Sequence, residues 1–283
     1  MTSLSYYSPD SLTEAITLLG SADARPLAGG YSLLIEPQRS KLGGALVDLR
    51  RIGDLVGVTQ GQGGEVTIGA MTPLAAIAAA SAVQQSYAAL AEAAASVGDA
   101  QVRNRATLGG NLAQSDAGND LPAAILALGG LLHVQGAREE RIVAASDFFT
   151  GPGQTALAAG ELITAVTLPA PTGRSGSAYE KMKHPATLYA ICGVAASVSL
   201  DANGAVEACS VAVTGAAEYP TRLKSVESAL TGKTPTGDAI AAAAQGAGEG
   251  LSFRSDLFAS ADYRAHLTRV LTQRALTRAL AQA

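Results

Sequence analysis

The hydrophobic pattern of the first fifty residues predicts a small unit of strands around one helix. Residues 11–14, Ser-Leu-Thr-Glu, form a capping box, and the helix that they open is expected to end at Gly20. Apolar runs at residues 25–27 and 45–49 predict two strands of a βαβ unit. The first strand leads directly into a glycine loop, which is the position where such units bind ligands.

The middle of the chain alternates between strand-like and helix-like patterns. Residues 55–68 predict a hairpin around a glycine-rich turn, and Thr72 before Pro73 is expected to cap a helix. The alanine-rich stretch to Ser96 predicts two helices, and Asp120 is expected to cap another. Three further strands are predicted from apolar alternation, at residues 131–134, 141–143 and 162–168.

A proline-rich segment, residues 169–173, separates a last part of the chain with its own pattern. Three strands are predicted there, at residues 178–183, 190–200 and 206–214, with helices after them. Four arginines on the last helix are expected to form a solvated face: Arg264, Arg269, Arg274 and Arg278. The whole pattern predicts an α+β protein with three domains, at residues 1–52, 53–170 and 171–283.

Two glycine loops carry the candidate chemistry. Residues 27–32 read Leu-Ala-Gly-Gly-Tyr-Ser, and residues 107–111 read Thr-Leu-Gly-Gly-Asn. Paired glycines let successive backbone N–H groups form a concave nest for an anion, usually a phosphate. Two nests suit a ligand with two linked phosphates, so a dinucleotide is the first hypothesis. Ordinary turns are the alternative, because glycine pairs also mark turns.

Composition narrows the possible function classes. Of the 283 residues, 48% are hydrophobic and 16% are charged, so the chain can form real cores. The net charge of −4 argues against nucleic acid as a partner, since neutralising phosphates needs a basic face. No export signal and no apolar run long enough for a bilayer are found, which predicts a cytoplasmic protein that does not span a membrane.

The titratable residues form no recognisable catalytic motif. The histidines, His133, His184 and His266, lie far apart and lack metal-ligand spacing. The two cysteines, Cys192 and Cys209, are expected to be buried thiols and are too few for an iron–sulfur cluster, which needs four ligands. A chain without its own acid–base pair is consistent with one that holds a redox cofactor.

Three segments resemble one family in the same order along the chain. They are AGGYS at residues 28–32, QVRNRATLGGNLAQSDAGNDLPA at residues 101–123 and SADYRAHLTRVLTQRAL at residues 260–276. Together they resemble the FAD-binding medium subunit of molybdenum hydroxylases, with aerobic carbon monoxide dehydrogenase as the nearest type and xanthine dehydrogenase as a relative. The resemblance implies a small N-terminal βαβ unit, a middle α+β FAD-binding domain, and a C-terminal three-stranded antiparallel sheet with helices.

The resemblance also implies which residues contact FAD. The first cradle would consist of Leu27, Ala28, Gly29, Gly30, Tyr31, Ser32, Leu33 and Leu34. The second would consist of Thr107, Gly109, Gly110 and Asn111. Asp120 would accept from a ribityl or ribose hydroxyl, while Val97 and Ile163 would make apolar contacts. Tyr31 departs from the His, Gln or Thr that relatives often carry there.

Two further positions are implied beside the flavin ring. Lys181 falls where the family has a cation near the flavin N1–C2 edge, and a positive charge there would stabilise reduced flavin. Lys183 is the rival, because strand alternation places both lysines on the same side. Tyr189 falls where carbon monoxide dehydrogenases have a tyrosine beside the isoalloxazine ring.

The function that the resemblance implies is electron transfer within a larger enzyme. Substrate would be oxidised at a molybdenum cofactor in a large partner chain, and electrons would pass through [2Fe–2S] clusters of a small partner to FAD and then to an external acceptor. A dimer of such heterotrimers is expected, with no metal site in this chain. Two alternatives stay open: a self-sufficient FAD-dependent oxidoreductase acting on its own substrate, and a non-catalytic scaffold whose loops hold only phosphate.

Overall fold

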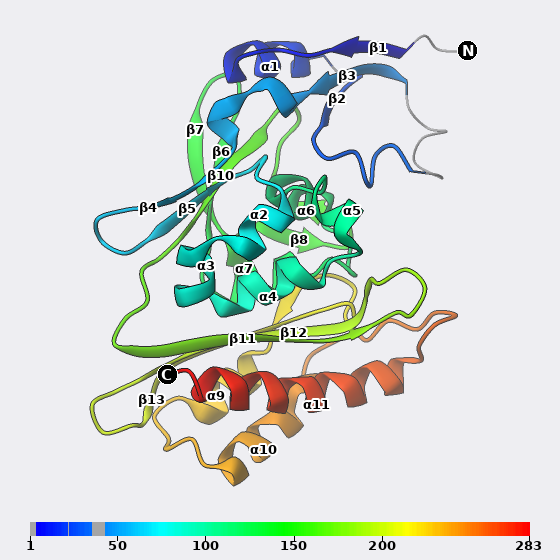
Figure 1. Ribbon diagram of the computed structural model, residues 1–283. Helices are drawn as coiled ribbons and strands as arrows, with labels where there is room; N and C mark the ends of the chain where they lie inside the picture. Colours follow the sequence, from blue (N-terminus) through cyan, green and yellow to red (C-terminus); the bar gives the residue numbers. More distant parts are fainter. Residues whose placement is uncertain (1–3, 22, 36–42) are drawn as a thin grey trace.

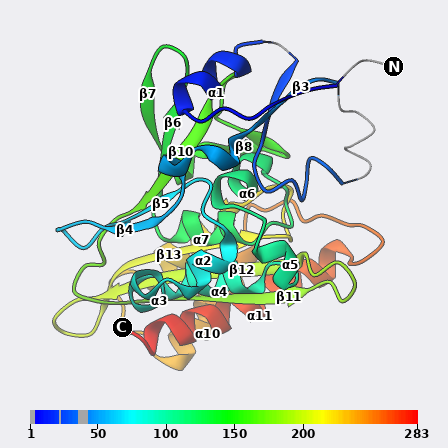
Figure 2. The same cartoon turned by 45° about the horizontal axis from the view of Figure 1, so that its top comes forward.

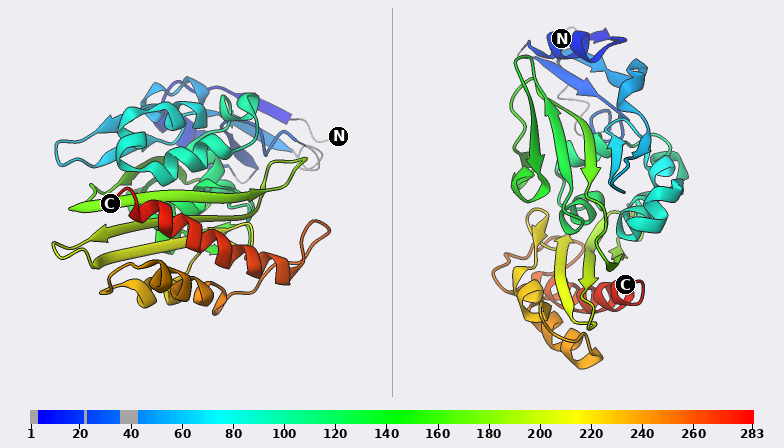
Figure 3. Two further views of the ribbon diagram at one scale, coloured as in Figure 1. Left: turned by 60° about the horizontal axis from the view of Figure 1, so that its bottom comes forward. Right: turned by 90° about the vertical axis from the view of Figure 1, so that its left-hand side faces the viewer.

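The chain folds into three layers that follow one another through the molecule (Figure 1). The computed structural model describes residues 4–21, 23–35 and 43–283. A small N-terminal unit lies at one end, a sheet with several helices occupies the middle, and a second sheet with the C-terminal helices lies at the other end. The side view in Figure 3 shows the same succession.

The N-terminal unit is a parallel sheet with one helix. Its strands, in spatial order, are β1 (Leu4–Tyr7), β3 (Gly44–Asp48) and β2 (Ala24–Leu27). Helix α1 (Leu12–Leu19) is capped as predicted, because Ser11 Oγ accepts from the Glu14 N–H at 3.3 Å and Gly20 is the C-cap. Strand β1 was not predicted, since all four of its residues are exposed and give no alternation.

The middle layer is an antiparallel sheet covered by short helices. Its strands, in spatial order, are β4 (Val58–Gln60), β5 (Val66–Gly69), β10 (Leu162–Leu168), β6 (Leu131–Gln135) and β7 (Glu140–Ala144). The predicted hairpin and the three predicted strands are confirmed. The helices are α2 (Leu74–Ala79), α3 (Ser81–Ser86), α4 (Ala88–Ser96), α5 (Ala100–Arg103), α6 (Leu108–Gln114), α7 (Leu121–Ala127) and α8 (Ala145–Phe148), followed by a small hairpin of β8 (Phe149–Gly151) and β9 (Gln154–Thr155). Figure 2 shows α2–α7 between the N-terminal unit and the C-terminal sheet.

The alanine-rich stretch forms three helices, so the prediction of two was wrong. Ala80 and Tyr87 leave the helical region of backbone space and interrupt it twice. Tyr87 is buried, and its hydroxyl donates to the carbonyl of Pro169 at 3.0 Å, which ties the interruption to the end of β10. The predicted Thr72 cap was also wrong. Its hydroxyl instead accepts from the Gly57 N–H at 2.8 Å and donates to the Gly57 carbonyl at 3.0 Å.

The C-terminal layer is an antiparallel sheet with helices on its outer face. The predicted strands are confirmed as β11 (Arg174–Lys183), β12 (Ala190–Leu200) and β13 (Val206–Thr214), and a two-residue strand, β14 (Thr221–Arg222), extends the sheet by one. The outer helices are α9 (Lys224–Leu230), α10 (Gly237–Gln245) and α11 (Ala261–Leu280). The overall α+β class with three sheet-containing layers is therefore confirmed.

Strand alternation places the C-terminal sheet between two cores. Tyr179, Ala195 and Ala212 join the core of the middle layer, whereas Ala178 and Val194 join the core under α9–α11. Figure 3 shows α11 running beneath the sheet. Both faces of this sheet are therefore packed, and its inner face supports the helices that surround the candidate site.

Of the four arginines predicted to form a solvated face on α11, three are exposed, namely Arg269, Arg274 and Arg278, but the fourth is the buried Arg264. Its side chain is 3% exposed and donates to the carbonyls of Ile191 and Gly215, at 2.5 and 2.7 Å, and to Asp256 at 2.6 Å. Arg278 is also engaged, with ion pairs to Glu92 and Glu180. The buried Cys192 and Cys209 are free thiols, as predicted.

Candidate functional site

The first glycine loop follows β2 and crosses to the middle layer. A Cβ added at Gly29 would lie 2.1 Å from the carbonyl oxygen of Arg105, so only glycine allows the backbone of the two segments to approach this closely. Gly30 has a φ of 84°, which favours glycine for a second reason. The turn closes where the Leu34 N–H donates to the Gly30 carbonyl at 3.1 Å.

The backbone of this loop offers hydrogen-bond donors. Within the described ranges, the N–H groups of residues 29–33 donate to no other residue. Buried or half-buried N–H groups are nearly always paired in proteins, with another residue, water or a ligand. The first loop therefore keeps the donor groups that the sequence analysis expected for an anion nest.

The second glycine loop is the start of helix α6. Thr107 is the N-cap, and its Oγ1 accepts from the Gly110 N–H at 3.3 Å. The N–H groups of Leu108 and Gly109 already donate to the carbonyls of Thr72 and Ala70, at 3.2 and 2.8 Å. The structure therefore differs from the predicted nest at these two positions. What this loop offers a ligand is the Thr107 hydroxyl and the side chain of the neighbouring Asn111.

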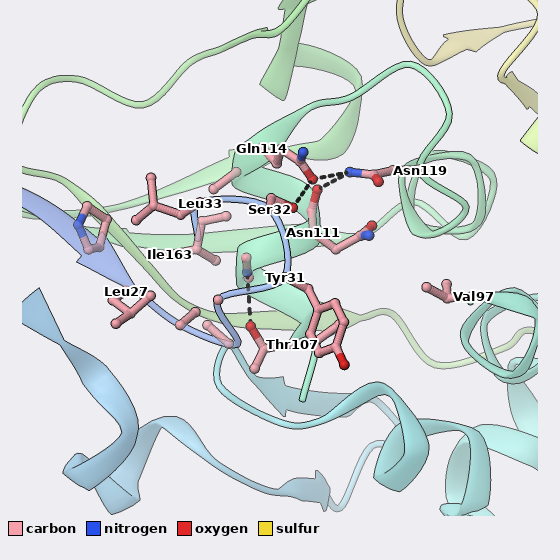
Figure 4. Close-up of a pocket in the computed structure, with 18 of the residues that line it drawn as sticks. Leu27, Tyr31, Ser32, Leu33, Val97, Thr107, Asn111, Gln114, Asn119 and Ile163 are labelled. Atoms are coloured by element: carbon pink, nitrogen blue, oxygen red, sulfur yellow. Dashed lines mark hydrogen bonds between the residues drawn. The ribbon is translucent and has the colours of Figure 1, made fainter. Parts of the chain in front are cut away.

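A cavity of about 630 Å³ lies between the two loops. This volume falls in the range of pockets that hold drug-sized ligands or cofactors, about 300–1,000 Å³. Most of the predicted site residues line it: Leu27, Ala28, Gly30, Tyr31, Ser32, Leu33, Val97, Thr107, Gly109, Gly110, Asn111, Asp120, Ile163 and Tyr189. Gly29, Leu34 and Lys181 were predicted but do not line it. Figure 4 shows Leu27, Leu33 and Ile163 on one side and Val97 on the other.

A polar network joins the two loops across the cavity wall (Figure 4). Ser32 Oγ donates to Gln114 Oε1 at 2.7 Å. Asn119 Nδ2 donates to the carbonyl of Asn111 at 2.9 Å and to Gln114 Oε1 at 3.3 Å. The sequence analysis missed Gln114 and Asn119. Their position inside the polar segment after the second glycine loop was the only available signal.

One buried atom of the site lacks a partner. Asn111 Oδ1 is buried and accepts no hydrogen bond from any described residue. An unpaired buried acceptor costs about 1–3 kcal/mol, so such an atom in a cavity points to a ligand donor. Together with the free N–H groups of the first loop, it gives the cavity both donors and an acceptor for a polar ligand.

Asp120 forms a buried charge network at the edge of the cavity. Its Oδ2 lies 2.8 Å from Lys181 Nζ, and its Oδ1 accepts from the Tyr179 hydroxyl at 2.6 Å. Lys181 also donates to the carbonyl of Ser96 at 3.1 Å. Burial raises the pKa of Asp120, and Lys181 and Tyr179 offset part of this rise. Burial, with Asp120 beside it, also raises the pKa of Tyr179 well above its usual value.

This network shows that the predicted capping role of Asp120 was wrong, and it distinguishes the two lysines that were candidates for a cation near the flavin. Asp120 stands at the N-cap position of α7, but its side chain makes no capping bond, because both oxygens are engaged elsewhere. Of the two candidate lysines, Lys181 lies beside the cavity wall with a side chain that is 6% exposed, whereas Lys183 is exposed. Lys181 does not line the cavity itself but pairs with Asp120, which does.

Apolar side chains make up most of the remaining wall. Leu27 and Ile163 are buried, and Val97 is half-buried beside α5. Tyr189 is 44% exposed, and its ring lies against Gly118. An apolar cavity with a few convergent polar groups is the usual form of a cofactor site. The donors, the unpaired acceptor and the size of the cavity thus fit a flavin dinucleotide.

The rest of the described chain offers neither a metal site nor a membrane helix. In residues 4–21, 23–35 and 43–283, no three His, Cys, Asp or Glu side chains gather closely enough to hold a metal ion. No helix in those ranges is both long and apolar enough to cross a bilayer. His133 instead pairs with Thr167 Oγ1, at 2.8 Å.

Comparison with known proteins identifies two family segments. Residues 2–171 match the family described as FAD binding domain in molybdopterin dehydrogenase, and residues 177–279 match the CO dehydrogenase flavoprotein C-terminal domain. The chain is 37% identical to the carbon monoxide dehydrogenase medium chain of Afipia carboxidovorans, covering 99% of this chain and 98% of that protein. It is 33% identical to the 6-hydroxypseudooxynicotine dehydrogenase complex subunit alpha of Paenarthrobacter nicotinovorans, covering 99% and 96%.

A solved structure gives the same result. The structure resembles carbon monoxide dehydrogenase from Hydrogenophaga pseudoflava with a TM-score of 0.93 at 36% identity, covering 99% of this chain and 98% of that one. These relatives are medium chains or subunits of multi-subunit enzymes. With both family segments in order along the chain, it belongs to the family of FAD-binding medium subunits of the molybdenum hydroxylases, an oxidoreductase family.

Proposed function

We propose that this chain is the electron-transfer subunit of a molybdenum-containing hydroxylase or dehydrogenase, and that the cavity between the two glycine loops is its FAD site. The observation that carries the assignment of the site is the unpaired, buried Asn111 Oδ1, which belongs to a residue lining the same cavity as the first loop. When bound, FAD supplies the redox chemistry, accepting electrons and passing them on.

Each part of the wall has a proposed role toward the cofactor. The N–H groups of residues 29–33 donate to its anionic oxygens, and the Thr107 hydroxyl and Asn111 Oδ1 bind its polar edges. Leu27, Val97 and Ile163 exclude water from its apolar surface. Asp120 accepts from a hydroxyl of the cofactor, since a carboxylate oxygen that already accepts one hydrogen bond can accept another.

We further propose that two kinds of partner chain complete the enzyme. A small chain with [2Fe–2S] clusters would deliver electrons, and a large chain with the molybdenum cofactor would oxidise the substrate, in a dimer of heterotrimers. This chain has two cysteines, fewer than the four ligands that an iron–sulfur cluster takes. This number supports a partner chain as the source of the electrons. Both cysteines are buried free thiols, which are ordinary in the cytoplasm, the compartment that we propose.

The test is the identity and behaviour of the flavin on the purified chain. Heat release followed by chromatography should recover FAD, and recovery of FMN alone would contradict the assignment of the site. The loaded chain should be reduced by dithionite but not by organic substrates of molybdenum hydroxylases. Reduction by such a substrate without partner chains would instead favour a self-sufficient oxidoreductase.

A pair of variants connects the flavin to the cavity. Gly110→Val places side-chain atoms beside Thr107 Oγ1 and Ala28 Cβ, which an added Cβ at Gly110 would approach to 2.9 and 3.4 Å. Gly237→Val is the control, because nothing lies within 4 Å of an added Cβ there. Flavin content should fall in the first variant and stay unchanged in the second. Full occupancy in both would show that FAD binds elsewhere.

A further inference from the structure

The loop between β11 and β12, residues 184–189, forms one wall of the cavity. Thr187, Leu188 and Tyr189 all line it. Leu188 has a φ of 61°, in the left-handed region that residues other than glycine seldom adopt. A strained conformation of this kind persists only where the surrounding contacts fix it. The shape of the wall therefore depends on contacts made inside this loop.

These contacts converge on His184. Its N–H donates to the Tyr189 carbonyl at 2.8 Å, and its carbonyl accepts from the Leu188 N–H at 2.9 Å. Its Nδ1 accepts from the N–H groups of Ala186 and Thr187, at 3.3 and 3.0 Å, and the Thr187 hydroxyl lies 3.0 Å from the same atom. A ring nitrogen that accepts carries no proton, so the imidazole proton is on Nε2.

We propose that His184 is a positioning residue for the FAD cavity, whose unprotonated Nδ1 holds residues 186–189 in place as its wall. The inference rests on the proposed function, namely that the cavity holds FAD. Without an acceptor at this position the N–H groups of Ala186 and Thr187 are unpaired, so the wall loosens and FAD release is faster.

The surroundings of the imidazole supply no competing acceptor or donor at Nδ1 among the described residues. The Phe258 ring packs against it, with centroids 4.3 Å apart and planes at 66°. Lys183 adjoins His184 in the sequence, and Asp256 lies two residues before Phe258. Asp256 is held by Arg264 at 2.6 Å, and Asp116 accepts from the Gly118 N–H at 2.8 Å. The bonds at Nδ1 thus come from the loop itself.

The test measures the rate of FAD release from the loaded chain, followed by flavin fluorescence. His184→Ala has no acceptor and should release FAD about tenfold faster than wild type, the equivalent of one or two lost hydrogen bonds. His184→Asn keeps an acceptor, because Oδ1 takes the place of Nδ1, and should release FAD at the wild-type rate.

A control variant separates positioning from a general effect. His266→Asn removes an exposed histidine on α11 and should release FAD at the wild-type rate. Fast release from His184→Asn, or a wild-type release rate in His184→Ala, would overturn the proposal.

A second measurement, amide hydrogen exchange, needs no flavin. It therefore tests the role of His184 separately from the proposal that the cavity binds FAD. The amide hydrogens of Ala186 and Thr187 should be protected from exchange in wild type and in His184→Asn, and lose that protection in His184→Ala. Equal protection in all three chains would contradict the role of His184 even if no FAD were bound. Absence of FAD from every chain, with the predicted protection intact, would contradict only the FAD site.

Discussion

The first glycine loop, at the end of β2, keeps its backbone N–H groups available, whereas the second, at the start of α6, has already used two of them. Each loop has one glycine that permits close packing. Gly29 lies against the backbone of Arg105, and a Cβ at Gly109 would come within 2.7 Å of Ala70 Cβ. The difference teaches that a glycine pair can serve packing at one position and ligand contact at the next.

Each loop also has a carboxylate close to it, and the pKa values of these two carboxylates shift in opposite directions. Asp48 lies opposite Leu27 at the end of the first strand pair, and Asp120 follows the second loop. Burial alone would raise the pKa of Asp48, but hydrogen bonds from Arg50 and Tyr6 outweigh it and lower that pKa. At Asp120 burial dominates and the pKa is raised. Both carboxylates are buried, but Asp48 pairs with the exposed Arg50, whereas Asp120 pairs with the buried Lys181.

The largest expected effect concerns the buried pair beside the second loop. Lys181→Met leaves Asp120 as an unpaired buried charge and should lower the free energy of unfolding by about 3–5 kcal/mol. The double variant Lys181→Met with Asp120→Asn removes both charges and should recover most of the loss. Urea unfolding of the three chains measures both effects. A single variant as stable as wild type would show that the pair does not support this side of the cavity.

The next effect separates the two glycines of the first loop. Gly29→Ala should lower the free energy of unfolding by about 3 kcal/mol, because its Cβ would meet backbone atoms that cannot rotate away. Gly30→Ala should cost about 1 kcal/mol from its positive φ, because the atom nearest its added Cβ, Leu34 Cδ1 at 3.0 Å, belongs to a side chain that can move. Gly237→Ala is the control, since an added Cβ there touches nothing within 4 Å. Equal losses of unfolding free energy in Gly29→Ala and Gly30→Ala would contradict the view that Gly29 serves packing and Gly30 serves ligand contact.

The two carboxylates should respond oppositely to acid. Asp48 has a folded-state pKa below its unfolded value, so its stabilisation is present above about pH 4 and is lost as the pH falls further. Asp48→Asn should therefore cost on the order of 2 kcal/mol at neutral pH, with a difference from wild type that shrinks in acid. Asp120 has a raised pKa, so protonation favours the folded chain, and Asp120→Asn should not reduce acid sensitivity. Unfolding curves from about pH 7 to about pH 3 test both signs.

A smaller effect tests the unpaired acceptor on the second loop. Asn111→Ala removes a buried oxygen without a partner, so the chain without FAD should be as stable as wild type, while FAD should bind about tenfold more weakly. Asn119→Ala is the matched comparison, because its side chain makes two hydrogen bonds and its loss should cost about 1 kcal/mol of stability. Unchanged FAD affinity in Asn111→Ala would leave its Oδ1 without a ligand role.

Local signals predicted much of the fold, because their partners lie within a few residues. Ser11 and Gly20 define α1 through contacts inside its own first and last turns. Alternating apolar residues defined the strands of both antiparallel sheets for the same reason. β1 escaped prediction because its pairing partner lies about forty residues away and its own residues are exposed.

The failures share one physical cause, a partner distant in the sequence. Thr72 and Thr107 both stand before a helix, but only Thr107 caps one, since Thr72 bonds to Gly57. Arg264 has the spacing of a surface arginine but is buried against the ends of β12 and β13. The glycine loops and most site residues could be placed from the family resemblance. The pairing of Lys181 with Asp120 could not, because it joins residues 61 positions apart.

Amide hydrogen exchange of the two glycine loops, with and without FAD, tests the central claim most directly. The account predicts that the amides of residues 29–33 exchange quickly in the FAD-free chain and become protected when FAD is added. The amides of Leu108 and Gly109 should be protected in both states, because they already donate to backbone carbonyls. No change in the first loop, or an equal gain of protection in both loops, would contradict the assignment of the cavity between them as the FAD site.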